Sequence, residues 1–176
     1  NCYIINFFDD SKMSEKKIII LTGSEIRHEF FSKCLLSNDK INVAAIYCEG
    51  FEKSLGNTLA QNPESSDLEY QHFHARAQSE LDFFNDGITS IDFVQAPKYL
   101  RYGSINEKEV VRQILSYDAD LIACYGCSLI GQDLLKAYSG RIINAHLGLS
   151  PYYRGSGTNV WPLIENEPDP SIFTFV

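Results

Sequence analysis

Residues 16–48, KKIIILTGSEIRHEFFSKCLLSNDKINVAAIYC, decide the fold of this chain. Lys16–Thr22 is a short apolar run rich in isoleucine, which predicts a buried strand. A helix follows to about Leu36, and the hydroxyl of Ser24 is placed to cap its first turn. Ile41–Cys48 is a second apolar run and predicts a second strand. A strand–helix–strand unit of this kind is typical of a parallel sheet.

The alternation of strands and helices continues along the chain. Polar stretches at residues 49–67 and Pro97–Ile105 are expected to be loops. The spacing predicts further helices at Leu68–Asn85, Asn106–Tyr117 (with Asn106 as N-cap) and Gly131–Tyr138, and further strands at Ser90–Val94, Asp120–Tyr125, Arg141–Ala145 and Ser171–Val176. Together these elements predict an α/β fold, a Rossmann-like open and mostly parallel sheet with helices on both faces.

The composition excludes several classes of protein. The 176 residues carry a formal net charge of −8, which disfavours nucleic-acid binding because phosphate neutralisation needs a basic face. The apolar runs are too short to span a membrane, which takes roughly 20 residues. Five cysteines at irregular spacing, with no secretory signal near the start, indicate reduced thiols in a cytoplasmic protein. The sequence does not determine the oligomeric state.

The two ends of the chain point to an extension and a truncation. The chain starts at Asn1 and its first methionine is Met13, so residues 1–12 are expected to be an extension of unknown origin. Residues 13–176 are expected to form one domain. Because Ser171–Val176 has the pattern of a strand with nothing after it, we expect this domain to be truncated at its carboxyl end.

The stretch that carries the chemistry is RIINAHLGLSPYYRG, residues 141–155. It begins as an apolar strand and continues into a loop with glycine and proline. Asn144 and His146 are two residues apart at the carboxyl end of this strand, where alternate side chains share one face. Ligands of open α/β sheets bind at the carboxyl ends of the strands. The pair therefore lies where a ligand is expected.

An amide and an imidazole placed together suit the transfer of an acyl group to an amine. That reaction passes through a tetrahedral intermediate, whose oxyanion is stabilised by N–H donors fixed in advance. Asn144 and His146 both offer such donors, and the histidine can also move protons near neutral pH. From the spacing alone a second interpretation is open, in which His146 is a structural histidine and Asn144 caps the strand.

Asn144–Gly155, NAHLGLSPYYRG, resembles the signature of the folate-dependent formyltransferases, which transfer a formyl group from 10-formyltetrahydrofolate to an amine. This family includes methionyl-tRNA, glycinamide ribonucleotide and sugar N-formyltransferases. Asp120–Ile130, DLIACYGCSLI, resembles the strand and loop that precede the signature in the family. The sequence departs from the pattern at Gly148, where the family usually has serine, and at Ser150, where it often has leucine.

The resemblance implies a formyltransferase with 10-formyltetrahydrofolate as co-substrate and a small-molecule amine as acceptor. Asn144 and His146 would stabilise the developing oxyanion, with His146 also in proton transfer. Backbone groups of one loop would hold the pterin ring, and a second group of residues would border the acceptor. The loop consists of Cys127, Ser128, Leu129 and Ile130, and the second group of Ser150, Arg154 and Gly155. The family also uses an aspartate, and its position would lie beyond Val176, so this chain is expected to lack it. Either the chain is truncated or the protein is not active as given.

The acceptor amine is open to three interpretations. An amino sugar on a nucleotide is the first expectation, because Tyr152–Gly155 and Asn159–Trp161 resemble the sugar-modifying members. Glycinamide ribonucleotide fits if Gly23–Ser24 binds its phosphate on helix N–H groups, assisted by Arg27 and His28; a purely structural turn is equally open. Methionyl-tRNA is disfavoured by the acidity of the chain.

Two hypotheses of another class also stay open. A non-catalytic folate-binding module would bind folate and show no turnover. A nucleotide-binding α/β domain that matches the motif by chance would bind nucleotide and ignore folate.

No metal site is predicted. Cys124 and Cys127 form a CxxC, but a redox pair normally begins a helix, and no second pair completes a zinc site. Core packing for Cys124 and loop lining for Cys127 are therefore favoured. His72 and His74 are two apart on an expected helix, so they point to different sides and are expected on a solvated face.

Overall fold

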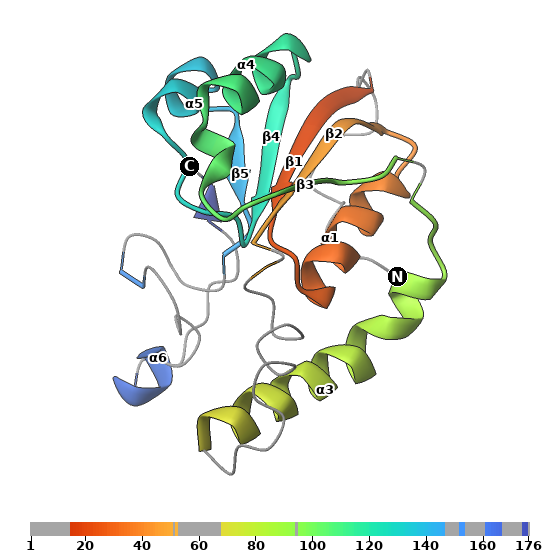
Figure 1. Cartoon of the computed structure of the whole chain (residues 1–176), viewed down its shortest axis with the longest axis vertical. Helices are drawn as coiled ribbons and strands as arrows, with labels where there is room; N and C mark the ends of the chain where they lie inside the picture. The colour runs from red at the N-terminus through yellow and green to blue at the C-terminus, as the bar shows by residue number, and fades with distance from the viewer. Residues whose placement is uncertain are drawn as a thin grey trace.

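The computed structural model describes residues 15–50, 52, 68–93, 95–146, 152–153, 161–166 and 174–175 (Figure 1). The described strands are β1 (Lys16–Thr22), β2 (Ile41–Glu49), β3 (Lys98–Leu100), β4 (Leu121–Tyr125), β5 (Ile142–Asn144) and β6 (Thr174–Phe175). The described helices are α1 (Ile26–Leu36), α3 (Leu68–Thr89), the 3-10 helix η3 (Ser104–Asn106), α4 (Lys108–Ser116), α5 (Gln132–Ala137) and α6 (Trp161–Ile164). None of these helices is long and apolar enough to cross a membrane. The predicted extension at residues 1–12 lies outside the described residues.

The described strands form one sheet in the order β3-β2-β1-β4-β5-β6. The pairs β3–β2, β2–β1, β1–β4 and β4–β5 are parallel, and the pair β5–β6 is antiparallel. The chain runs outward from β1 to β3 and then returns to the other side of β1 with β4. β1 and β4 therefore flank the switch point where ligands bind in sheets of this kind. The predicted mostly parallel α/β fold is confirmed.

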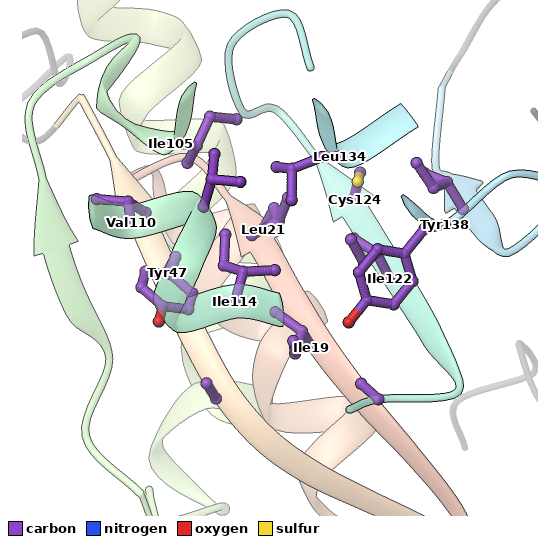
Figure 2. Close-up of a cluster of buried hydrophobic side chains, with 14 residues drawn as sticks. Ile19, Leu21, Tyr47, Ile105, Val110, Ile114, Ile122, Cys124, Leu134 and Tyr138 are labelled. Carbon is purple, nitrogen blue, oxygen red and sulfur yellow. The ribbon is translucent and has the colours of Figure 1, made fainter. Parts of the chain in front are cut away.

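β1 is buried on both faces, and its alternate residues build two separate cores. Ile18 and Ile20 pack on the α1 side of the sheet. Ile19 and Leu21 lie on the opposite side, under α4 and α5 (Figures 1 and 2). That second core also contains Tyr47, Ile105, Val110, Ile114, Ile122, Cys124, Leu134 and Tyr138. Because both faces are covered, the strand has an unbroken apolar sequence rather than an alternating one.

The prediction of a strand at Ser90–Val94 is wrong. Residues 90–93 form no strand, and Val94 lies outside the described residues. Phe93 packs against the core on the α1 side, which explains the apolar signal in this stretch. The third strand instead lies within the expected loop Pro97–Ile105, where Lys98–Leu100 pairs with the last three residues of β2. This short edge strand has exposed side chains at Lys98 and Tyr99, so it lacks the pattern that marks a strand.

Two predicted helix caps are also wrong. The N-cap of α1 is Glu25 rather than Ser24, because the backbone N–H of Glu25 donates a 3.1 Å hydrogen bond to Nδ1 of His28. The N-cap of α4 is Glu107 rather than Asn106, since Asn106 belongs to the 3-10 helix that precedes α4.

α3 packs against α1, outside the sheet (Figure 1). The rings of Phe30 and Phe84 lie 5.1 Å apart between centroids, and Arg27 forms an ion pair with Glu80. Gly87 allows this approach, because a Cβ at that position would overlap the ring of Phe30.

Gly87→Ala is expected to lower the free energy of unfolding by about 1–3 kcal/mol, because overpacking against Phe30 outweighs the gain of about 1 kcal/mol in helix propensity. Chemical denaturation followed by circular dichroism measures the change. In a Phe30→Ala background the same substitution is expected to be neutral or stabilising. A loss of stability that persists in that background would show that Phe30 is not the cause.

His28 packs against the two glycines that follow β1 and β4, Gly23 and Gly126. His28 is 4% exposed, and its ring meets the ring of Tyr125 edge-on, with centroids 4.8 Å apart. A Cβ on Gly23 would lie 2.6 Å from the imidazole, and a Cβ on Gly126 would overlap it. Gly126 also has φ +73°, a conformation that favours glycine. Both glycines are therefore required by the packing of one histidine.

The buried His28 is neutral at physiological pH. Burial, with a smaller contribution from the charges of Arg27 and Arg76, lowers its pKa from 6.5 to about 3. Protonation would place a desolvated cation beside two guanidinium groups. The folded state therefore resists protonation in a range where the unfolded chain accepts the proton.

The stability that depends on neutral His28 is present above pH 6.5 and is lost as the pH falls from 6.5 towards 3. In this range the wild type is expected to lose up to about 1.4 kcal/mol of unfolding free energy per pH unit more than His28→Gln, which does not titrate. Urea titrations of both proteins between about pH 4 and 7.5 measure the difference. Equal slopes against pH for the two proteins would contradict the assignment.

Candidate functional site

The described members of the predicted site lie at one edge of the sheet. β1, β4 and β5 are parallel neighbours, so their carboxyl ends meet at what we call the carboxyl edge. Gly23–Ser24 follows β1, and Cys127–Ile130 follows β4. Asn144–His146 consists of the last residue of β5 and the two residues after it. The fold thus brings these three segments to the same place. The remaining predicted residues, Ser150, Arg154 and Gly155, lie outside the described residues.

Asn144 and His146 lie beside the end of β4. Asn144 is the last residue of β5 and pairs with Cys124. The N–H of Ala145 donates a 2.8 Å hydrogen bond to the C=O of Cys124, so the chain stays against β4 for one residue beyond the strand. Both Asn144 and His146 are half-buried, which leaves part of each side chain accessible. Their catalytic roles stay a prediction.

The loop that follows β4 is fixed by side chains from two other segments. The N–H of Ser128 donates to Oε2 of Glu49 at 2.8 Å, and the C=O of Leu129 accepts from Nδ2 of Asn106 at 2.8 Å. The side chain of Leu129 is 91% exposed. Among the described residues, the buried hydroxyl of Ser128 has no hydrogen-bond partner, and neither backbone group of Ile130 has one. The loop therefore offers unpaired polar groups and an exposed apolar side chain.

The turn at Gly23–Ser24 is held by its neighbours in the sheet. The N–H of Gly23 donates to the C=O of Tyr125, and the thiol of Cys48 donates to the C=O of Gly23, each at 3.1 Å. Burial raises the pKa of Cys48 to about 11, so this thiol keeps its proton. The turn is thus tied to both β2 and β4.

Two residues expected to help this turn bind an anion serve the fold instead. Arg27 is paired with Glu80 of α3, and His28 is buried and neutral. In addition, the N-cap residue Glu25 brings a negative charge to the first turn of α1, where it opposes a second anion. Because the N–H of Gly23 donates to Tyr125, phosphate binding at Gly23–Ser24 stays a prediction that rests on the backbone N–H of Ser24.

The cysteine pair and the histidine pair considered for metal or redox roles lie in different parts of the fold. Cys124 is 1% exposed within the core, and Cys127 packs against the same core. Both thiols are free; a hydrogen bond with Cys127 and burial raise the pKa of Cys124 well above its usual value, which disfavours thiolate chemistry. His72 and His74 are exposed on α3. Within the described ranges, no three His, Cys, Asp or Glu side chains are grouped to hold a metal ion.

Two residues of the carboxyl edge, Glu49 and Asn106, escape prediction from the sequence. Residues 49–67 are predicted as a surface loop, yet Glu49 is the last residue of β2 and only 1% exposed. Its two carboxylate oxygens accept hydrogen bonds from the N–H groups of Ile105 and Ser128. A glutamate placed directly after an apolar run, at the ligand-binding end of a strand, is the signal that could have revealed it.

The sequence is similar to those of known proteins. The family model described as formyl transferase matches residues 16–167 of this chain. The phosphoribosylglycinamide formyltransferase of Bacillus subtilis (strain 168) is 38% identical over 64 residues, which cover 36% of this chain and 33% of that protein.

Two solved structures, both of proteins named phosphoribosylglycinamide formyltransferase, share the fold of this chain. The protein from Coxiella burnetii has a TM-score of 0.52 at 19% identity, over 94% of this chain and 66% of its own. The protein from Anaplasma phagocytophilum has a TM-score of 0.51 at 12% identity, over 86% of this chain and 59% of its own. The chain thus spans between 59% and 66% of the length of these structures. The family model covers most of this sequence, and the chain belongs to the formyl transferase family.

Proposed function

We propose that the protein transfers a formyl group from 10-formyltetrahydrofolate to a primary amine. The observation that carries this proposal is that Asn144 and His146 lie beside the end of β4, the strand that the Cys127–Ile130 loop follows, through the pairing of Asn144 with Cys124 and the hydrogen bond of Ala145. Membership of the formyl transferase family supports the same reaction. The proposal includes that the protein is cytoplasmic and that the acceptor amine is a small molecule.

The donor would bind with its pterin ring against Cys127–Ile130. A pterin edge carries alternating donors and acceptors, which suit backbone N–H and C=O groups. Ile130 has both of its backbone groups unoccupied among the described residues, and the buried hydroxyl of Ser128 needs a partner. The exposed side chain of Leu129 would cover part of the ring. These features fit the donor.

Asn144 and His146 would act on the formyl carbonyl. The amine attacks the formyl carbon, and the carbonyl oxygen takes up negative charge. The side-chain N–H groups of Asn144 and His146 would stabilise that oxyanion, each by on the order of 3 kcal/mol. His146 would also pass the proton of the attacking amine to the folate nitrogen as its bond to the formyl carbon breaks. The products are the formamide and tetrahydrofolate.

Glycinamide ribonucleotide is the acceptor we propose. The relative from Bacillus subtilis is named for the phosphoribosyl form of glycinamide, and none of the relatives reported above is named for an amino sugar. The first expectation, an amino sugar on a nucleotide, is therefore less well supported. The phosphate would bind the backbone N–H of Ser24, because the N–H of Gly23 already donates to the C=O of Tyr125.

Calorimetric titration of the full-length protein with 5-formyltetrahydrofolate, an unreactive stand-in for the donor, is expected to show saturable binding at one site. In a formyl-transfer assay, glycinamide ribonucleotide is expected to have a kcat/KM at least about tenfold higher than an amino-sugar nucleotide, because a site built for one set of polar groups rejects another.

The alternatives give different results in the same two measurements. Folate binding without turnover of any amine would indicate a non-catalytic folate-binding module. A folded protein that binds nucleotide and ignores folate would exclude the proposed function. Faster turnover of the amino-sugar nucleotide would exclude the proposed acceptor and keep the reaction.

Asn144→Ala is expected to reduce kcat by about 10²–10³-fold, because its N–H acts on the transition state, and to leave the Kd for 5-formyltetrahydrofolate nearly unchanged. Asn42→Ala is the matched control, since Asn42 is an exposed asparagine of β2 outside the carboxyl edge. Steady-state kinetics and calorimetry on both variants separate turnover from binding. Near-normal turnover of Asn144→Ala would exclude the oxyanion role.

A further inference from the structure

Glu49 is a buried carboxylate at the carboxyl edge that the proposed reaction does not use. It ends β2 and is 1% exposed. Oε1 accepts a 2.8 Å hydrogen bond from the N–H of Ile105, and Oε2 accepts one of 2.8 Å from the N–H of Ser128. The donors belong to the segments that follow β3 and β4. One side chain therefore connects the ends of three strands.

The chemistry of this contact requires a carboxylate. Each oxygen of Glu49 faces a backbone N–H, and an ionised carboxylate offers acceptors on both sides. A glutamine would place an NH₂ group against one of these N–H groups. Burying a charge is costly unless it is hydrogen-bonded, and no Lys or Arg of the described residues forms an ion pair with Glu49. The backbone N–H groups of Ile105 and Ser128 thus supply the compensation.

Asn106 fixes the next part of the same loop. Its Nδ2 donates to the C=O of Leu129 at 2.8 Å, and its Oδ1 accepts from the N–H of Gly131 at 2.6 Å. A Cβ on Gly131 would lie 2.7 Å from that Oδ1, so the contact needs glycine. Glu49 and Asn106 together bind three backbone groups within residues 128–131.

We propose that Glu49 and Asn106 are positioning residues for the folate donor, which hold residues 128–131 in the conformation that receives the pterin ring. This inference rests on the proposed function and adds the residues that shape its donor site. The loop has no regular secondary structure, and the side chain of Leu129 is 91% exposed, so within residues 128–131 the apolar contact with the core is made by Ile130. A loop ordered before binding avoids the entropy loss of ordering when the ligand arrives.

Glu49→Gln in the full-length protein tests the inference, because it keeps the size of the side chain and removes one acceptor. The KM for 10-formyltetrahydrofolate and the Kd for 5-formyltetrahydrofolate are expected to rise about tenfold, since a buried N–H loses its charged partner. The KM for the amine is expected to stay unchanged. Ile46→Val, a buried change in the core on the α1 side, is the matched control and is expected to keep the donor KM of the wild type.

Asn106→Asp is the second variant. It keeps the acceptor for Gly131 and loses the donor to Leu129, and its exposed position spares the core. The donor KM is expected to rise about threefold to tenfold at an unchanged amine KM, as for the loss of one hydrogen bond. This variant gives a readout even if Glu49→Gln does not fold.

The outcomes distinguish the positioning role of Glu49 and Asn106 from the proposed function on which it rests. Unchanged donor affinity in the variants, or an equal rise in both KM values, would overturn the inference while the wild type still binds 5-formyltetrahydrofolate. Absence of binding by the folded wild type would overturn the proposed function and this inference with it. A selective rise in the donor constants of either variant, without a change in Ile46→Val, supports the positioning role.

Discussion

Burial of both faces of β1 is the constraint on which the rest of the structure depends. Ile18 and Ile20 need a cover on one side, and Ile19 and Leu21 need one on the other, so α1 must lie opposite α4 and α5. A strand buried in this way also needs a partner at each edge, which β2 and β4 provide. These demands place the ends of β1 and β4 together at the carboxyl edge, where the chain offers its polar groups.

At the carboxyl edge, apolar packing and polar contacts fix different segments of the chain. The ring of His28 fits only because Gly23 and Gly126 lack side chains, and this close packing joins the turns that follow β1 and β4. Hydrogen bonds from Glu49 and Asn106 then fix the loop after β4. The residues proposed for the chemistry approach from β5, on the far side of β4. The site thus combines a rigid apolar base with loops held by a few polar side chains.

The sequence predicts those features whose cause is local. Lys16–Thr22 and Ile41–Cys48 are recognisable because both faces of each strand are apolar, and Asn144 stands out because it ends such a run. β3 is missed because a short edge strand has no buried pattern of its own. Glu49 is missed because its partners are backbone groups 56 and 79 residues away, and a side chain's sequence neighbours do not reveal such contacts. Asn106 is misjudged for the same reason: its oxygen bonds a distant loop instead of the helix that follows it.

The position of β4 next to β1 has a consequence for the order in which the chain folds. The N–H of Lys17 donates to the carboxylate of Asp120, so two neighbouring strands are joined by residues 103 apart in the sequence. Contacts within β1, α1 and β2 are far more local, and closing a shorter loop costs less entropy. We therefore expect β1, α1 and β2 to assemble first and β4 to join them later. Cys127–Ile130 follows β4, so the loop proposed to receive the donor forms only after the first half of the sheet has assembled.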